Sequence, residues 1–367
     1  MIEWSSAIPD LRSASMPSNI TRPPAPSCLR RLLGAAATAL VAVAAPPVPL
    51  SAAAPPPSFD LQAHRGGRGE TTEESLRAFA KSLELGVSTL ELDVVVTKDG
   101  QPLVWHDPTI QPAKCDDTAP AVAADPQYPY VGKLVHDLTL AQIRTLDCGK
   151  MLDDFPGAEV VADNRIATLR DVFALTDSYA ADVRYNIETK VEADKPDTSA
   201  SPRESVDVIL AAVRSAGKVG QVEIQSFDWR TLPLMRQSEP SIPLVALWDE
   251  TTWVPGSPWL NGIDPVVVGD PVVGARMVGA DVVSPGYSVP YGLAPNDPGF
   301  ALVADEAFVD RAHALGLKVI PWTINDADTM RAQIATGVDG IITDYPALLR
   351  GVMAQLGMPL PAPYHRR

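Results

Sequence analysis

The sequence has 367 residues, 36 of them proline, and a formal net charge of −15 at pH 7. A chain of this length holds one large domain or two ordinary ones and can bury a sizeable core. Its negative charge repels polyanions, which argues against nucleic acid as a partner. An anionic substrate would need a metal ion or a local group of cationic side chains.

The first 57 residues have the features of a signal peptide and a disordered leader. Arg30 and Arg31 precede an apolar run over residues 32–45, and small residues follow it. This order is typical of secretory signal peptides, and the run is shorter than the roughly 20 residues that span a bilayer. We therefore predict an exported protein (secreted, periplasmic or in the cell envelope) with no stable membrane span in its mature chain. A disordered tail or a membrane anchor is the alternative.

From residue 58 onward, short β-rich runs alternate with amphipathic helical stretches. Strands are predicted at 60–64, 89–96, 103–106, 183–190, 222–227, 244–248, 281–284, 318–323 and 340–343. Helices are predicted at 74–85, 140–146, 169–178, 203–216, 230–236, 305–315, 326–335 and 346–356. This alternation is typical of βαβ units with a parallel sheet, and eight or nine strands in one series favour a closed (β/α)₈ TIM barrel of the α/β class.

Two stretches interrupt the alternation. Residues 108–165, after the third predicted strand, are rich in proline and are predicted to form a loop-rich insertion. They contain Cys115 and Cys148, which export would favour as one disulfide, with two free thiols as the alternative. Residues 250–275, rich in Gly, Pro and Trp, are predicted to be irregular. The barrel domain is expected to span 58–356, followed by a proline-rich tail at 357–367.

Polar side chains gather near the C-terminal ends of the predicted strands, where barrel enzymes carry their active sites. His64 closes the first strand and His106 the third, while Gln225 and Asp344 end or follow later strands. Two imidazoles that face each other suit general acid–base catalysis, because each can take or give a proton near neutral pH. A structural role for each histidine is the alternative.

Three acidic residues in this set indicate a metal site. Glu91 and Asp93 are two residues apart on one strand, so both side chains point to the same face, and Glu188 lies near the end of another strand. Converging carboxylates are costly to bury without a partner and are the ligands that Mg²⁺ or Ca²⁺ prefers. A salt-bridge network with Arg65 and Lys190 is the alternative.

Three further residues are candidates for the same site. Arg65 precedes two glycines, so its guanidinium and the backbone could both approach a phosphate, although such glycines also form ordinary turns. Glu73 could join the site from the start of the first helix or serve as a first-turn acid. Trp322 could form a wall of the substrate pocket or pack in the core.

Taken together, these motifs resemble the glycerophosphodiester phosphodiesterase family, in particular its exported bacterial members. The matching segments follow the family's order and lie at 63–66, 73–75, 91–93, 97–100, 106–107, 186–190, 225–228, 322–325 and 339–346. The sequence departs from the family where Glu74 and Ser75 replace the Asn and Thr of a Glu-Asn-Thr motif, which adds a negative charge. The family fold is a (β/α)₈ barrel, in agreement with the strand count.

The resemblance implies metal-dependent hydrolysis of small glycerophosphodiesters to glycerol 3-phosphate and an alcohol, a reaction of glycerol and lipid metabolism. It implies acid–base roles for His64 and His106, and Mg²⁺ or Ca²⁺ on Glu91, Asp93 and Glu188. It also implies phosphate binding by Arg65 and Lys190, and an insertion that shapes the pocket. Two alternatives are a lipid-cleaving phosphodiesterase, resembling sphingomyelinase D or phospholipase C, and a non-catalytic barrel that binds in the cell envelope. The sequence makes no prediction of oligomeric state.

Overall fold

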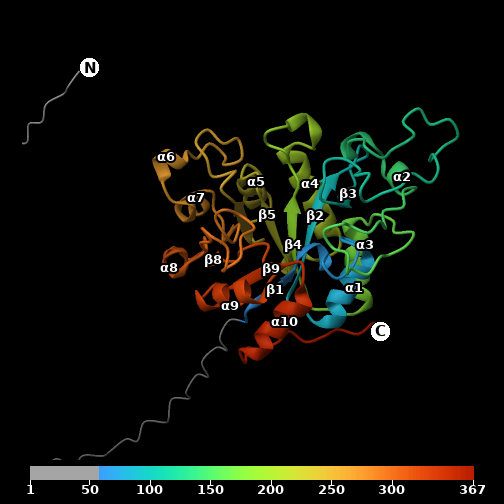
Figure 1. Ribbon diagram of the computed structural model, residues 1–367. Coiled ribbons are helices and arrows are strands. Elements are labelled where there is room, and N and C mark those ends of the chain that lie inside the picture. Colours follow the sequence, from blue (N-terminus) through green and yellow to red (C-terminus); the bar gives the residue numbers. More distant parts are fainter. Residues whose placement is uncertain (1–57) are drawn as a thin grey trace, which may run out of the picture. The chain divides into compact units, whose positions relative to one another are not determined.

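A computed structural model describes residues 58–367, so the predicted signal peptide lies outside the described residues (Figure 1). Within them, eight parallel strands form a sheet in the order β8-β7-β6-β5-β4-β2-β1-β9, and β3 pairs with β2. The strands are β1 (Asp60–Ala63), β2 (Thr89–Val96), β3 (Pro102–Val104), β4 (Arg184–Thr189), β5 (Val222–Ser226), β6 (Leu244–Trp248), β7 (Val282–Pro285), β8 (Lys318–Val319) and β9 (Gly340–Thr343).

Backbone hydrogen bonds bring the two ends of this sheet together. The amide of Asp339 donates to the carbonyl of Val319 (2.9 Å), and the amide of Ile342 donates to that of Pro321 (3.0 Å). These bonds connect the segment around β8 with β9, so the sheet curls into a barrel with the helices outside it (Figure 1). The predicted (β/α)₈ TIM barrel is therefore confirmed.

The ten α-helices of the described residues follow the strands along the chain, with four short 3₁₀ helices between them. The α-helices are α1 (Leu76–Leu85), α2 (Leu140–Ile143), α3 (Leu169–Ser178), α4 (Pro202–Ser215), α5 (Thr231–Ser238), α6 (Pro265–Val268), α7 (Pro271–Met277), α8 (Glu306–Ala314), α9 (Ala327–Ala335) and α10 (Pro346–Gln355). The 3₁₀ helices are η1 (His64–Gly66), η2 (Val135–Asp137), η3 (Pro196–Thr198) and η4 (Val219–Gln221). None of the helices within residues 58–367 is both long enough and apolar enough to span a bilayer.

Helix α4 illustrates why these segments are helical. Its buried apolar side chains, Val206, Ile209, Leu210 and Val213, recur at the spacing of one helix face. Ser201 caps its first turn by accepting a hydrogen bond from the amide of Glu204, and proline occupies the first helical position. Burial of one such face against the barrel is what holds the helix in place, because isolated helices of this length are marginal in water.

The third predicted strand is not a barrel strand, and this part of the prediction was wrong. β3 pairs antiparallel with β2, and Val94 faces Val104 in the register. Only five residues, 97–101, separate the two strands, whereas a parallel return needs a connection of a dozen or more residues. His106 therefore lies beyond β3, at the beginning of the insertion.

The insertion has a small core of its own, separate from the main core under the helices. Buried members of this second cluster include Trp105, Ile110, Tyr130 and Leu138. A disulfide joins Cys115 and Cys148 within it, which leaves these two cysteines unable to act as free thiols. The loops of the insertion surround α2 (Figure 1).

Two segments outside the barrel strands are more ordered than the sequence predicted: the stretch 250–275 and the tail 357–367. The stretch predicted to be irregular, 250–275, contains α6 and most of α7, each preceded by an aspartate that caps its first turn and each beginning with proline. These Asp-Pro pairs, Asp264-Pro265 and Asp270-Pro271, are ordinary helix-start signals. In the predicted tail, the amide of Tyr364 donates to the carbonyl of Leu83 at 2.8 Å, so this end of the chain is bound to α1.

Candidate active site

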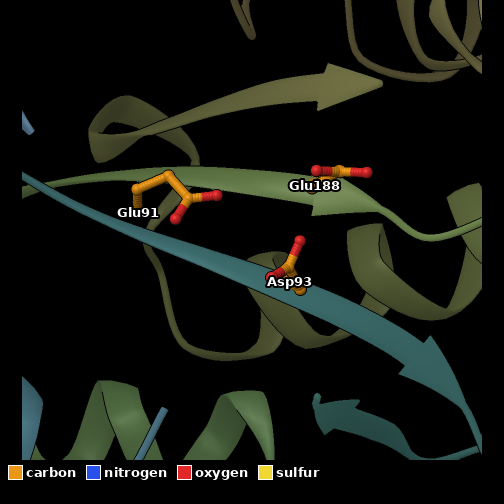
Figure 2. Close-up of side chains that lie close together, drawn as sticks. All are labelled: Glu91, Asp93 and Glu188. Atoms are coloured by element: carbon orange, nitrogen blue, oxygen red, sulfur yellow. The ribbon is translucent and has the colours of Figure 1, made fainter. Parts of the chain in front are cut away.

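The side chains of β2 alternate between the core and the barrel interior. Leu90, Leu92 and Val94 belong to the main hydrophobic core, so Glu91 and Asp93, which alternate with them, face the inside of the barrel. In the register, Asp93 pairs with Glu188 of the neighbouring strand β4. Figure 2 shows the result: the three carboxylates converge, and each offers an oxygen within 4.8 Å of the others.

Burial gives these three acids unequal proton affinities. Burial and the Asp93 carboxylate raise the pKa of Glu91 well above its ordinary value, and burial raises the pKa of Glu188 to about 7. Burial also opposes ionisation of Asp93, but His106, Lys190 and Arg65 hold the pKa of Asp93 below its ordinary value. The cluster is therefore short of positive charge, and Asp93 is the member most firmly ionised.

Ion pairs surround the cluster, as the alternative interpretation of its sequence predicted. Lys190 Nζ lies 2.9 Å from Glu188 Oε1, and Arg65 Nε lies 3.1 Å from Asp93 Oδ2. The contact network holds seven carboxyl groups and four lysines or arginines, so full ionisation of its acids needs positive charge from a further cation. The acids are Glu73, Glu74, Glu91, Asp93, Asp107, Glu188 and Asp344. The basic residues are Arg65, Arg68, Lys114 and Lys190.

The donor set fits a hard divalent cation. All three converging side chains are carboxylates, and Asp93 Oδ2 is buried and, although it lies 3.1 Å from Arg65 Nε, accepts no well-aligned hydrogen bond within the described residues. The amides of Arg65 and Gln225 hold the two oxygens of Glu91 at 2.8 and 2.6 Å, which fixes its orientation. Oxygen-only ligands with a net negative charge suit Mg²⁺ or Ca²⁺ rather than zinc.

His64 is held by a carboxylate from the other end of the chain. Ala63 of β1 pairs with Thr343 of β9, so the residues that follow them, His64 and Asp344, emerge side by side. His64 Nδ1 lies 2.5 Å from Asp344 Oδ1, and Asn325 donates to the other carboxylate oxygen at 2.7 Å. Asp344 therefore fixes the ring so that Nε2, 4.0 Å from Glu91 Oε2, faces the acidic cluster.

His106 has a similar arrangement on the insertion side. Its Nδ1 lies 3.2 Å from Oδ1 of Asp107, the next residue. Burial, with Lys190 and Arg65 nearby, lowers the pKa of His106 to about 4. Burial also lowers the pKa of His64, although Asp344 partly offsets this. Both imidazoles are therefore neutral near pH 7 in the metal-free protein.

Both histidines line one cavity of about 130 Å³ at the C-terminal ends of the strands. Its other lining residues are Arg65, Arg68, Glu91, Glu188, Gln225, Phe227, Leu247, Tyr291, Trp322, Thr323 and Ile342. Trp322 meets Phe227 edge to face at 5.3 Å, and its Nε1 donates to the carbonyl of Ser284. Trp322 thus forms part of an aromatic wall and is also anchored to the barrel.

The two predicted phosphate ligands occupy different positions. Arg65 lines the cavity, in the left-handed region of backbone conformation (φ 50°), and its guanidinium pairs with Glu73 and Asp93. Lys190 is paired with Glu188 and, among the described residues, is not one of those that line the cavity. Gly66, at φ 77°, lies so close to α1 that a side chain there would meet Ala78 at 3.0 Å. Gly66 therefore lets the loop that carries Arg65 lie close to α1, and Gly67 in turn lies close to Pro346 at the start of α10.

Glu73 and Glu74 enter the network in different ways. Glu73 does not cap α1, because Ser75 accepts the capping hydrogen bond from Ala78; its carboxylate instead pairs with Arg65 and Lys114. Glu74 accepts a hydrogen bond from the amide of Asp93 at 2.9 Å. Burial and the neighbouring acids raise the pKa of Glu74 well above its ordinary value, which favours the protonated form of this side chain.

Sequence reasoning did not assign roles to several residues of this site. The positions of Asp344 and Gln225 at strand ends indicated that both could belong to the site. Their partners, His64 and Glu91, could not be predicted, because they depend on the order of the strands in the sheet. Arg68 and Lys114 lie in loops, where no sequence pattern indicated that they belong to the site. Arg68 Nε donates to Asp344 at 2.8 Å, and its guanidinium lies over the Phe155 ring, 4.8 Å from the centroid.

Comparisons with known proteins agree with this site. The family model for glycerophosphoryl diester phosphodiesterases matches residues 64–348. The glycerophosphodiester phosphodiesterase of Bacillus subtilis is 27% identical over 296 residues, which cover 79% of this chain and 85% of the relative. That of Caldanaerobacter subterraneus is 27% identical over 303 residues, covering 80% and 98%.

Solved structures show the same likeness. A provisionally assigned glycerophosphoryl diester phosphodiesterase from Silicibacter pomeroyi has a TM-score of 0.66 at 27% identity, over 83% of this chain and 95% of that one. A phosphodiesterase from Oleispira antarctica, in complex with the product sn-glycerol-3-phosphate, shares the fold at a TM-score of 0.58 and 18% identity, over 80% and 96%. On the match over residues 64–348, this chain belongs to the glycerophosphoryl diester phosphodiesterase family and is a phosphoric diester hydrolase.

Proposed function

We propose that this enzyme hydrolyses glycerophosphodiesters to glycerol 3-phosphate and an alcohol, using a divalent cation and two histidines. One observation carries the proposal: two imidazoles, each held at Nδ1 by a carboxylate, line the same cavity as Glu91 and Glu188 of the acidic cluster. The relatives from Bacillus subtilis and Caldanaerobacter subterraneus, named for this activity, support the choice of substrate.

The cation would be held by Glu91, Asp93 and Glu188, the three converging carboxylates. When bound, Mg²⁺ or Ca²⁺ supplies positive charge that offsets the charge of the phosphodiester as it reacts. Arg65, which lines the cavity, binds a phosphoryl oxygen from the same side. The aromatic wall of Phe227, Tyr291 and Trp322 contacts the apolar parts of the glycerol or of the alcohol.

The histidines move the protons of the displacement. Because Asp344 occupies Nδ1 of His64, Nε2 is the nitrogen free to exchange a proton with a bound substrate. One imidazole accepts the proton of the attacking oxygen, from water or from the adjacent glycerol hydroxyl, as the new P–O bond forms. The other takes up a proton at Nε2 from solvent before the reaction and donates it to the departing alcohol oxygen as the P–O bond breaks. The anionic substrate raises the proton affinity of the imidazole that it contacts.

The lipid-cleaving alternative is not favoured. It needs apolar side chains exposed beside the cavity, and the tryptophans at 248, 253 and 259, in and around the stretch predicted to be irregular, are the large apolar side chains that could supply them. Trp248 is buried, with 8% of its surface exposed, and Trp253 packs against Trp248 and Trp229. These two side chains therefore serve the core of the barrel.

We also propose that the chain is exported. The disulfide between Cys115 and Cys148 is a bond that persists in oxidising compartments, which supports this location. N-terminal sequencing of the protein recovered from culture medium or periplasm would test it. A mature chain that starts near residue 55 is expected, and an intact N-terminus on protein confined to the cytosol would contradict the proposal.

The activity is tested by release of glycerol 3-phosphate from glycerophosphocholine, first with EDTA and then with Mg²⁺ or Ca²⁺ restored. We expect no release with EDTA and recovery with one of the two cations. His64→Ala and His106→Ala should each abolish turnover and leave the fold intact. Failure to cleave glycerophosphocholine, glycerophosphoethanolamine and glycerophosphoglycerol, in folded and metal-supplied protein, would refute the proposed function.

A further inference from the structure

The insertion contributes one cationic side chain, Lys114, to the network of ion pairs around the active site. Lys114 Nζ lies 2.5 Å from Glu73 Oε1 and 2.5 Å from Asp107 Oδ2, and only 15% of its side chain is exposed. The side chains of Glu73 and Asp107 are 4% and 21% exposed. One ammonium group therefore bridges two acids, the buried Glu73 and the partly exposed Asp107.

Each of these acids uses its second oxygen on a residue of the catalytic cavity. Asp107 Oδ1 lies 3.2 Å from His106 Nδ1, and Glu73 Oε2 lies 3.2 Å from Arg65 NH1. Lys114 thus contacts both Asp107, which holds His106, and Glu73, which holds Arg65. Removal of its charge takes one partner from each acid, so Asp107 can turn toward solvent and Glu73 loses the contact that holds its Oε1.

Lys114 is itself fixed from several sides. The next residue, Cys115, is bonded to Cys148, and a pair of backbone hydrogen bonds joins Asp116 to Asp147 at 2.7 and 3.1 Å. The Lys114 ammonium lies 5.0 Å from the centre of the Trp105 ring. A side chain held this way loses little conformational entropy when it contacts its neighbours. It can therefore keep the reacting groups in fixed positions.

We propose that Lys114 is a positioning residue, contributed by the disulfide-closed insertion, that holds His106 through Asp107 and Arg65 through Glu73. The inference rests on the proposed function for the roles of His106 and Arg65. It gives the insertion a part in catalysis beyond the shaping of the pocket. Lys114 is not among the side chains that line the catalytic cavity, so it acts through its two carboxylate partners.

Three substitutions test this role. Lys114→Met keeps the length of the stem and its packing on Trp105 while it removes the charge. Lys114→Arg restores a cation that can bridge two carboxylates. Lys150→Met is the matched control, because Lys150 lies on the same insertion and, within residues 58–367, forms its one ion pair with Asp116, whose side chain is 67% exposed; its other contact is a hydrogen bond to the carbonyl of Pro112 at 2.9 Å. Full-length protein is used throughout, and kcat, KM and Tm are measured for each variant with glycerophosphocholine.

We expect Lys114→Met to lower kcat by about 10- to 100-fold, the usual effect of losing a supporting residue. Its Tm should stay close to that of Lys150→Met, and Lys114→Arg should recover most of the lost rate. A kcat for Lys114→Met equal to that of Lys150→Met would overturn the proposal. So would a loss that tracks Tm and that arginine fails to recover, because that pattern describes a purely structural residue.

A crystal structure of Lys114→Met supplies a measurement independent of turnover. The proposal expects the His106 ring and the Arg65 guanidinium to leave the positions they hold in the parent protein, and unmoved side chains would refute it. If the parent protein cleaves no glycerophosphodiester, the proposed function fails, while the displacement of His106 and Arg65 still decides the positioning role.

Discussion

Replacing Asp344 by asparagine removes the negative charge beside His64 while it keeps the size of the side chain. In the parent protein, Asp344 Oδ1 lies 2.5 Å from His64 Nδ1, and Asn325 and Arg68 hold the carboxylate in place. The charge matters most when His64 carries an extra proton during the reaction. An asparagine amide can also turn its NH₂ group toward Nδ1, which would favour the wrong tautomer of the ring.

The size of the effect follows from the bond that is lost. A hydrogen bond with a charged partner contributes about 1.5–3 kcal/mol, and each 1.36 kcal/mol changes a rate tenfold. Asp344→Asn should therefore lower kcat for glycerophosphocholine by roughly 10- to 150-fold, and by more if the tautomer is inverted. Steady-state release of glycerol 3-phosphate at saturating metal measures kcat, and thermal denaturation establishes that the variant is folded.

The same chain offers a control pair. His313 Nε2 lies 2.9 Å from Asp339 Oδ2 on the outside of the barrel, where 43% of the histidine side chain is exposed. Asp339→Asn removes the charge beside this exposed histidine and should leave kcat unchanged; because Asp339 Oδ2 also accepts a hydrogen bond from the amide of Val319 at 2.8 Å, thermal denaturation is measured for this variant too. Equal rates for Asp344→Asn and Asp339→Asn, in folded protein, would refute the role assigned to Asp344.

Three further predictions concern the metal, pH and the disulfide. Glu91→Gln removes one ligand charge and should raise the cation concentration for half-maximal activity by about 10- to 100-fold; an unchanged metal titration would argue against Glu91 as a ligand. Burial holds the pKa of His106 at about 4 in the folded protein, below its unfolded value of about 6.5, so the unfolded chain binds the proton first as pH falls. Metal-free protein should therefore lose up to about 2 kcal/mol of stability between pH 7 and pH 5 that His106→Gln does not lose, as measured by urea denaturation, and parallel curves would contradict this. The double variant Cys115→Ser/Cys148→Ser opens a loop of 33 residues and should lower the free energy of unfolding by about 3–4 kcal/mol, whereas no change would mean that the bond does not form in solution.

The barrel could be predicted because its strands are buried apolar runs separated by turn signals. The bounds of β2 and β9 agree with the prediction residue for residue. The error at β3 shows the limit of this reasoning. A short apolar run indicates a strand but not its partner or direction, and here the connection of five residues decides for the antiparallel pairing with β2.

The candidate site was predictable as far as it lies on strands. The rule that functional residues gather at the C-terminal ends of barrel strands indicated His64, Glu91, Asp93 and Glu188 from sequence spacing alone. The partner of His64 could not be read in the same way, since it lies 280 residues away in the sequence. Lys114 had no signal of any kind, because a loop has no periodicity to show where a side chain points.

The two histidines depend on different parts of the fold. His64 is oriented by Asp344, and these residues meet only because β1 and β9 pair where the two ends of the sheet come together. His106 follows β3, and its partner Asp107 is bound by a lysine of the disulfide-closed insertion. Local unfolding where β1 pairs with β9 should therefore displace His64 first, while local unfolding of the insertion should displace His106 first. A loss of activity without global unfolding can then be traced to one histidine or the other by the segment that has become unstable.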